Sequence, residues 1–352
     1  MNILGVPITL VTGFLGSGKT TLINNILDQV GDRRDQIAII VNEFGEVGVD
    51  HQLLIQAQEE VFQLNNGCIC CSLRSDLAES LAAIGRYFED NQKTLSHVII
   101  ETTGIADPAP ILQTISLSPI LSKAFRFDSV LTLIDCLNFE QILADFSEFY
   151  QQIAYADRFL LSKTEQVSPD RLEQIKAQLK EINPLADDRV FTVTEDFPLE
   201  QFFDLRLFQR ILEPEAKEKV CQHCGHHHDH NHECHCQESH DHNHHHDHQT
   251  DHDGFMSMVL KTDQVLQEDL FLQWLDWLLM TTQGQLYRYK GLVNLNDRDL
   301  MLALQGVNVA YQFDLTAYRL QAYDSQIVLI GKQLDESLIR LAFSELIQMS
   351  AD

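Results

Sequence analysis

The sequence of 352 residues contains no run of about 18 or more apolar residues, the length that a membrane-spanning helix needs. Its first residues also lack the basic and apolar segments of a secretory signal peptide. We therefore expect a soluble, cytoplasmic protein without a membrane partner. The hydrophobic content of 44% is sufficient for the core of one large domain or two ordinary ones.

Basic residues are also scarce. The chain has 25 lysines and arginines against 52 aspartates and glutamates, which gives a formal net charge of -27 at pH 7. An acidic surface repels nucleic acid and anionic membranes and favours cationic ligands. We therefore expect no nucleic-acid partner, and the alternative that the charge serves solubility alone stays open.

The cysteine pattern does not suit disulfide bonds. Seven of the eight cysteines lie in two tight clusters, and such close neighbours cannot readily bridge within their own cluster. In a reducing cytosol this distribution indicates metal ligation. Three solitary residues that could ligate a metal, His51, His97 and Cys136, are assigned to packing or surface.

The fold class predicted from roughly the first 200 residues is α/β, because strand-like and helix-like segments alternate along them. Repeated strand–helix units form a mainly parallel, doubly wound sheet that binds ligands at the carboxyl ends of its strands. The expected strands are Ile8–Thr12, Ile37–Asn42, His97–Glu101, Ser129–Ile134, Arg158–Leu161 and Arg189–Thr192, and the expected helices include Ser75–Phe88 and Pro169–Ile182.

The composition changes abruptly between Cys221 and His252, where 32 residues include 14 histidines, four cysteines and six acidic residues. Such a segment has almost nothing apolar to bury, so we expect a mobile linker there. Imidazole and thiolate suit Zn²⁺, with nickel, copper and cobalt ions as competitors, which predicts that the linker collects metal ions. A spacer that binds metal incidentally is the alternative.

Regular patterns resume near Phe255 and predict a smaller α+β domain on an antiparallel sheet. Its expected strands are Met256–Lys261, Leu286–Leu295, Leu300–Val309 and Gln326–Gly331, and its expected helices are Leu266–Thr281 and Asp335–Met349. Trp274 and Trp277 are expected in core or interdomain packing. The predicted organisation is a P-loop domain over residues 1–212, a His/Cys-rich linker over 213–254 and a C-terminal domain over 255–352.

Residues Gly13–Thr20 read GFLGSGKT, a full match to the phosphate-binding pattern G-x-x-x-x-G-K-[ST]. A glycine loop that opens a helix directs several backbone N–H groups and a partial positive charge toward one point. This predicts a nucleoside triphosphate site in which Lys19 reaches the β- and γ-phosphates and the Thr20 hydroxyl holds Mg²⁺. The expected nucleotide-binding residues of this loop are Gly13, Gly16, Ser17, Gly18, Lys19, Thr20 and Thr21.

A second apolar strand, His97–Glu101, ends in a carboxylate. In P-loop proteins an acidic group at this position holds the water shell of Mg²⁺, so we expect Glu101 to act with Lys19 and Thr20 in catalysis. Gly104 follows closely, and its backbone N–H can approach the γ-phosphate because glycine permits a close contact.

Cys68, Cys70 and Cys71 follow a turn at residues 65–67 and form a CxCC motif. Three thiols within four residues are better explained as thiolate ligands of a transition metal than as buried structural cysteines. Adjacent cysteines rarely all bind one ion, so a carboxylate or water should complete the site, with Glu43 and Glu46 as candidates. A redox-active or merely buried cluster is the alternative.

Four motifs, GFLGSGKTT, VNEFGEVGVD, NGCICCS and ETTGIADP, resemble in order and spacing those of the CobW-type GTPases, a P-loop family of proposed metallochaperones. RYKGLV, LQGV and VLIGKQLDE resemble the C-terminal domain of that family, so the resemblance covers nearly the whole chain. It implies that the CxCC motif lies beside the nucleotide, that the loop around Glu46 is the first switch, and that the segment after Glu101 is the second. Some relatives carry an extra glutamate where this chain has Val41, which favours Glu46 as the carboxylate ligand.

The resemblance implies GTP as the nucleotide, but the base signature departs from the family pattern. Ser162-Lys163-Thr164-Glu165 stands where guanine-specific members have N-K-x-D. Lys163 can still lie over the base, and Glu165 can accept hydrogen bonds from guanine N1 and N2. Serine in place of asparagine and the longer carboxylate both weaken the prediction of guanine specificity.

The sequence as a whole thus predicts a GTPase that uses Mg²⁺, binds Zn²⁺ through Glu46, Cys68, Cys70 and Cys71, and transfers the metal to a client metalloprotein. Because the γ-phosphate orders the switch loops, metal affinity should rise with GTP and fall after hydrolysis. Co²⁺ accepts the same ligands, so a cobalt chaperone for cobalamin synthesis or another metalloenzyme activator is an alternative. A nucleotide-responsive metal buffer or sensor and an ATP-driven enzyme for a small molecule also stay open, as does the oligomeric state.

Overall fold

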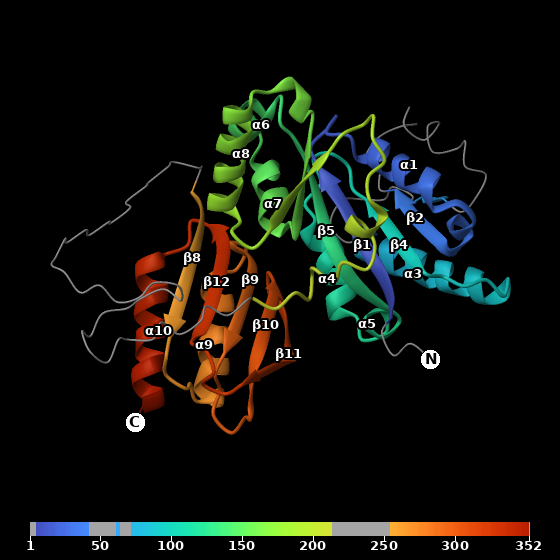
Figure 1. The fold of residues 1–352 in the computed structure, drawn as a ribbon. Helices are drawn as coiled ribbons and strands as arrows, with labels where there is room; N and C mark the ends of the chain where they lie inside the picture. The colour runs from blue at the N-terminus through green and yellow to red at the C-terminus, as the bar shows by residue number, and fades with distance from the viewer. Residues whose placement is uncertain (1–4, 42–60, 64–71, 213–253, 352) are drawn as a thin grey trace, which may run out of the picture.

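The computed structural model describes residues 5–41, 61–63, 72–212 and 254–351. Two β-sheets organise these residues, one of seven strands in the N-terminal part and one of five strands in the C-terminal part (Figure 1). None of the helices in these ranges combines the length and the apolar character that crossing a membrane requires.

The N-terminal sheet is parallel throughout, so the predicted α/β fold class is confirmed. Its strands are β1 (Val6–Gly13), β2 (Ile37–Val41), β3 (Val61–Gln63), β4 (His97–Glu101), β5 (Phe125–Asp135), β6 (Arg158–Ser162) and β7 (Asp187–Phe191). They lie in the order β3-β2-β4-β1-β5-β6-β7. Since all seven run in the same direction, their carboxyl ends share one edge of the sheet.

Helices cover both faces of this sheet, and the strand residues alternate between the two sides. In β4, for example, Val98 and Ile100 pack on one side and Ile99 on the other. One face is covered by α1 (Lys19–Val30), and the other by α3 (Ser72–Asp90), α4 (Ala109–Leu117), α6 (Phe139–Asp145), α7 (Ser147–Tyr155) and α8 (Pro169–Ile182). Shorter turns are η1 (Gly31–Gln36), α5 (Leu121–Ala124), η2 (Thr164–Gln166) and η3 (Leu199–Gln201).

The C-terminal part is an α+β unit built on an antiparallel sheet, as predicted. Two helices pack on one face of this sheet. Its strands are β8 (Phe255–Thr262), β9 (Leu286–Val293), β10 (Leu300–Val307), β11 (Ala310–Arg319) and β12 (Ser325–Lys332), in the order β11-β10-β9-β12-β8. The helices are α9 (Glu268–Thr281) and α10 (Glu336–Ala351). Trp274 is 5% exposed in the core between helices and sheet, and Trp277 packs against that core, which agrees with the packing role expected for them.

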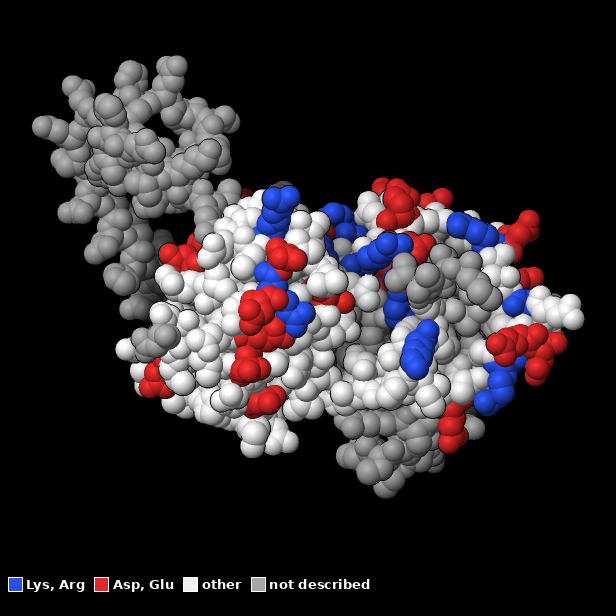
Figure 2. Space-filling model, turned by 90° about the horizontal axis from the view of Figure 1, so that it is seen from below, with Lys and Arg blue, Asp and Glu red and all other residues white. Residues whose placement is uncertain are grey.

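The two parts share an apolar cluster. Val307, Val328 and Ile330 of the C-terminal sheet belong to the same buried cluster as the helices α4, α7 and α8. The rings of Tyr150 on α7 and Phe255 on β8 stack with centroids 4.4 Å apart and an interplanar angle of 13°. On the face shown in Figure 2, acidic and basic side chains lie among each other, with wide uncharged areas between them.

Two strands were not predicted, β3 and β11. Strand β3 has only three residues, Val61–Gln63, too few for a periodic pattern. Strand β11 is an edge strand whose side chains are mostly exposed or half-buried, so its sequence shows no clean alternation.

Candidate nucleotide site

The phosphate-binding loop lies between the carboxyl end of β1 and the first turn of α1. Three of its glycines, Gly13, Gly16 and Gly18, have φ angles of 136°, 73° and 103°, in the region that other residues disfavour. At Gly13 a Cβ would also lie 2.5 Å from the carbonyl oxygen of Leu133 on β5. Backbone geometry therefore requires glycine at these positions, and the expected strand–loop–helix context is present.

Lys19 is the first residue of α1, and its side chain turns back into this loop. It is 8% exposed, and Nζ donates to the backbone carbonyls of Gly13 at 2.9 Å and Phe14 at 3.1 Å. Ser17 Oγ is buried and has no hydrogen-bond partner among the described residues. A fixed ammonium group and an unsatisfied hydroxyl at a helix N-terminus fit the phosphates of a nucleotide.

Thr20 and Glu101 are 81 residues apart in the chain and meet at the carboxyl end of β4. The Thr20 hydroxyl donates to Glu101 Oε1 at 2.8 Å, and Glu101 is 6% exposed. The parallel pairing of β1 with β4 brings the two side chains together. Oxygen ligands of this kind suit Mg²⁺, so the pair fits the ion that accompanies a nucleoside triphosphate. Thr21 is exposed at the next position of α1.

The segment after β4 packs directly against the phosphate-binding loop. A Cβ on Gly104 would lie 2.4 Å from the backbone nitrogen of Leu15, so glycine is required for this contact. Gln152 of α7 donates from Nε2 to the carbonyls of Gly104 at 3.1 Å and Ala106 at 3.2 Å. Sequence reasoning missed Gln152, because a polar residue within an amphipathic helix gives no sign that it is buried.

Ser162 joins the end of β6 to the phosphate-binding loop. Its hydroxyl lies 2.9 Å from the carbonyl oxygen of Ser17 and 3.1 Å from that of Ile134, both acceptors. Serine at this position therefore retains a bond to the loop that carries the phosphate-binding residues. Because the single hydroxyl proton is directed at backbone carbonyls, Ser162 has no donor left for a nucleotide base.

Asp135 fixes the neighbouring Lys163. Lys163 has a φ angle of 56°, and its Nζ donates to Asp135 Oδ2 at 2.6 Å. Asp135 also accepts from the backbone N–H groups of Leu137 and Asn138. Burial alone would raise the pKa of Asp135, but the hydrogen bonds from Lys163 and Asn138 outweigh it and lower the pKa. Sequence reasoning missed Asp135, although it ends a strand at the carboxyl edge where ligands bind.

Glu165 lies in the turn η2 that follows Lys163. Its side chain is exposed, and Oε1 accepts from Gln166 Nε2 at 3.0 Å, which lowers the pKa of Glu165. An ionised, exposed carboxylate at this end of β6 can accept hydrogen bonds from a base.

The predicted transition-metal site lies outside the described residues: Glu43, Glu46, Cys68, Cys70 and Cys71. Within the described ranges, no group of three or more histidine, cysteine, aspartate and glutamate side chains could hold a metal ion. The strands that lead into both segments are described, since β2 ends at Val41 and β3 at Gln63. Both strands run parallel to β4, so both segments leave the sheet at the edge that holds Glu101.

The solitary residues of the described ranges lie in packed surroundings. His97 is 3% exposed, and its Nε2 lies 2.8 Å from Thr9 Oγ1. Burial, with a smaller contribution from Arg126, lowers the pKa of His97 to about 3, so its ring is neutral. Burial raises the pKa of Cys136 to about 12, which leaves an unreactive thiol. His51 lies outside the described residues.

Comparisons with known proteins cover both parts of the chain. The family model described as CobW/HypB/UreG, nucleotide-binding domain, matches residues 7–188, and the one described as cobalamin synthesis protein cobW C-terminal domain matches residues 255–347. The chain is 32% identical over 343 residues to the zinc chaperone YjiA of Escherichia coli, covering 97% of this chain and 98% of that protein. It is 29% identical over 351 residues to zinc-regulated GTPase metalloprotein activator 1 of Schizosaccharomyces pombe, covering 94% and 83%. The crystal structure of the Zn(II)-bound YjiA GTPase from E. coli aligns with a TM-score of 0.70 at 26% identity, covering 98% and 99% of the two chains.

Proposed function

The chain belongs to the CobW/HypB/UreG family. We propose that it is a GTP-hydrolysing metallochaperone that delivers a transition metal to a client metalloprotein, with zinc as the first candidate. The names of two relatives, a zinc chaperone and a GTPase metalloprotein activator, support the metal and the client. The observation that carries the GTPase is the contact of Thr20 with Glu101 beside the buried Lys19.

The catalytic contribution of this chain is positioning and electrostatics. Mg²⁺, when bound with GTP, supplies positive charge next to the phosphate oxygens on which negative charge develops. Thr20 and Glu101 would provide oxygens for that ion, and Lys19, held by the carbonyls of Gly13 and Phe14, would provide a second positive charge in the loop. Gly104 offers a backbone N–H from a segment that already packs on the loop.

The proposed cargo site consists of Cys68, Cys70 and Cys71 with Glu46. Its support is topological: the segments that contain these residues follow β2 and β3, whose carboxyl ends share the edge with Glu101. A metal held there would be next to the bound nucleotide. When the nucleotide orders the switch segments, it can therefore change the affinity of this site for the metal. We propose the same three units as domains, 1–212, 213–254 and 255–352, with the linker as an accessory metal-binding segment.

The decisive test is the dependence of metal affinity on the nucleotide. In a variant without residues 221–252, we expect Zn²⁺ affinity to be at least about tenfold higher with Mg²⁺ and a non-hydrolysable GTP analogue than with Mg–GDP, a coupling of about 1.4 kcal/mol. A chelator-competition titration measures both affinities, and a parallel Co²⁺ titration decides between the two metals.

The matched control is the same deletion with Cys70→Ser and Cys71→Ser, which should lose tight binding in both nucleotide states. If neither the Zn²⁺ affinity nor the Co²⁺ affinity differed between the GTP analogue and GDP, gated delivery would be contradicted. The metal buffer would then be the better explanation.

Guanine preference is proposed to depend on Glu165, because Ser162 already directs its hydroxyl at the loop. Replacing Glu165 by alanine should lower GTP affinity about tenfold and leave ATP affinity within about twofold, since hydrogen bonds to a charged group contribute about 1.5–3 kcal/mol. Competition against a fluorescent guanine nucleotide measures both. Glu173→Ala, an exposed carboxylate on α8, is the control and should change neither value. A wild-type chain that binds ATP as tightly as GTP would contradict the proposal.

A further inference from the structure

Gln152 is a buried polar side chain beside the segment that follows β4. It is 0% exposed on α7, and its Nε2 donates to two carbonyls of the segment after β4, those of Gly104 and Ala106. Its Oε1 has no hydrogen-bond partner among the described residues. A buried amide is costly unless it is bonded, so a fully buried glutamine with both its bonds on one short segment is a specific arrangement.

The same helix also makes polar and aromatic contacts with the C-terminal part. Two residues before Gln152, the ring of Tyr150 stacks on Phe255 of β8. Three residues after it, the hydroxyl of Tyr155 donates to Asn308 Oδ1 at 2.7 Å, and its ring contacts that of Tyr287 on β9 with centroids 5.7 Å apart. Helix α7 therefore contacts the segment after β4 and the C-terminal sheet at once.

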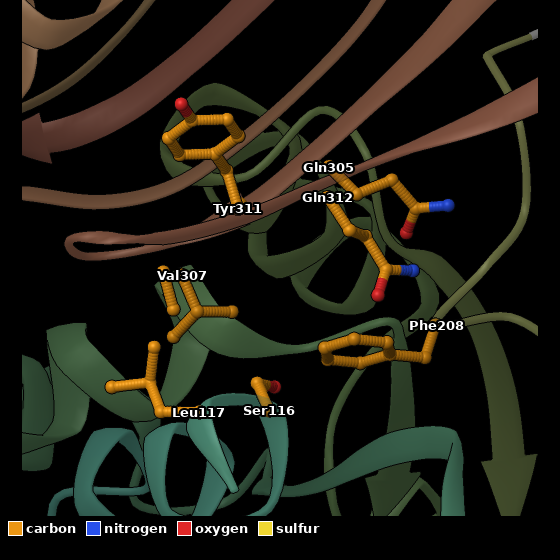
Figure 3. Close-up of a pocket in the computed structure, with 9 residues that line it drawn as sticks. Ser116, Leu117, Phe208, Gln305, Val307, Tyr311 and Gln312 are labelled. Carbon is orange, nitrogen blue, oxygen red and sulfur yellow. The ribbon is translucent and has the colours of Figure 1, made fainter. Parts of the chain in front are cut away.

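Helix α4 also connects these regions, because it begins directly after that segment, at Ala109, and contacts β10 and β11. Its last residues, Ser116 and Leu117, lie opposite the hairpin of β10 and β11. Figure 3 shows them on one side of a pocket, with Val307 and Tyr311 of the hairpin on the other. The pocket has a volume of about 80 Å³, so a small gap lies beside the contact that α4 makes with the hairpin.

We propose that Gln152 is a positioning residue that joins the segment Gly104–Ala106 to α7, so that a change of that segment with the nucleotide is transmitted to the docking of the C-terminal part. The inference rests on the proposed GTPase function, because Gly104 is the residue whose N–H approaches the γ-phosphate. Gln152 does not itself touch the nucleotide. It holds the peptide next to Gly104 while its helix holds the C-terminal sheet.

The test replaces Gln152 by methionine, which keeps a similar volume and removes both donors. We expect kcat for GTP to fall about tenfold with KM within about twofold, because the segment acts in the transition state. In the full-length wild-type chain with Mg²⁺, amide hydrogen exchange of β8 and β9 should differ between a non-hydrolysable GTP analogue and GDP. In Gln152→Met this difference should disappear while the chain stays folded.

Gln305→Met is the matched control. Gln305 is a glutamine of β10, 2% exposed, that bonds Asp314 and not the segment after β4. It should keep kcat and the nucleotide-dependent exchange. If Gln152→Met does not fold, Gln152→Asn keeps the amide but withdraws it by one methylene and should give the same loss.

The two proposals fail in different ways. A wild-type chain that hydrolyses GTP but shows the same exchange in β8 and β9 with both nucleotides overturns the role of Gln152 alone. A Gln152→Met variant that retains the nucleotide-dependent exchange overturns it as well. A wild-type chain that binds no GTP overturns the proposed function itself.

Discussion

Replacing Lys19 by alanine is expected to lower GTP affinity and GTP turnover by about 100-fold or more. The ammonium group is held in the phosphate-binding loop by the carbonyls of Gly13 and Phe14, so it is preorganised for a phosphate. Removing one preorganised donor from such a site costs roughly 10²–10³ in rate. Equilibrium binding of a fluorescent GTP analogue and single-turnover hydrolysis measure the two losses.

Two comparisons make this result specific. Lys176→Ala removes a lysine whose ion pair with Glu173 lies on the surface of α8, and it should change neither affinity nor turnover. Thermal unfolding of Lys19→Ala without nucleotide shows whether the loop carbonyls tolerate the loss of their donor. A folded Lys19→Ala variant that hydrolyses GTP at the wild-type rate would contradict the assignment of the loop as the catalytic nucleotide site.

Local patterns predicted the elements that depend on local chemistry. Helix α8 spans Pro169–Ile182, the bounds expected from its apolar spacing, because Ser168 caps its first turn and proline occupies its first position. Strand β11 depends on its neighbour instead. It pairs with β10 through its backbone while side chains such as that of Leu315, 74% exposed, face solvent. An edge strand of this kind has no hydrophobic alternation from which to predict it.

The residues of the candidate site also fall into two groups, those that a local motif fixes and those that depend on contacts between distant parts of the chain. Lys19 and Gly13 contact each other within one motif, so the spacing of the motif predicts their geometry. Gln152 and Asp135 act on residues 48 and 28 positions away, and no local pattern marks such contacts. The motif RYKGLV shows a related limit. Its resemblance to a family does not say where its charged residues lie, and both Arg288 and Lys290 are buried against the N-terminal part.

The second large effect is expected from Asp157, whose carboxylate meets two buried cations. Asp157 Oδ1 accepts from Arg288 Nη2 at 3.0 Å and lies 3.3 Å from Lys290 Nζ, and all three side chains are at most 6% exposed. Replacing Asp157 by asparagine keeps the shape but leaves two cations without their counter-charge. We expect the free energy of unfolding to fall by about 3–5 kcal/mol.

Urea denaturation followed by tryptophan fluorescence measures this loss, because Trp274 lies in the C-terminal core. The control is Asp204→Asn, since the Asp204 side chain is 72% exposed in its pair with Arg126. An exposed pair contributes little, so the control should stay within about 1 kcal/mol of wild type. Equal losses in both variants would contradict the importance of burial at Asp157.

The pH dependence of this loss identifies the cation responsible. Burial lowers the pKa of Lys290 to about 8; Asp157 opposes this shift, and Arg288 adds to it. Because the folded pKa lies below the ordinary value of 10.5, the unfolded chain binds more protons between these pH values, and the contribution of Lys290 to stability rises with pH there. Without Asp157 the pKa of Lys290 falls further, so the folded variant releases this proton at a lower pH than wild type. The loss caused by Asp157→Asn should therefore be larger at about pH 6 than at about pH 9, whereas an equal loss at both would assign the whole penalty to Arg288, which stays charged.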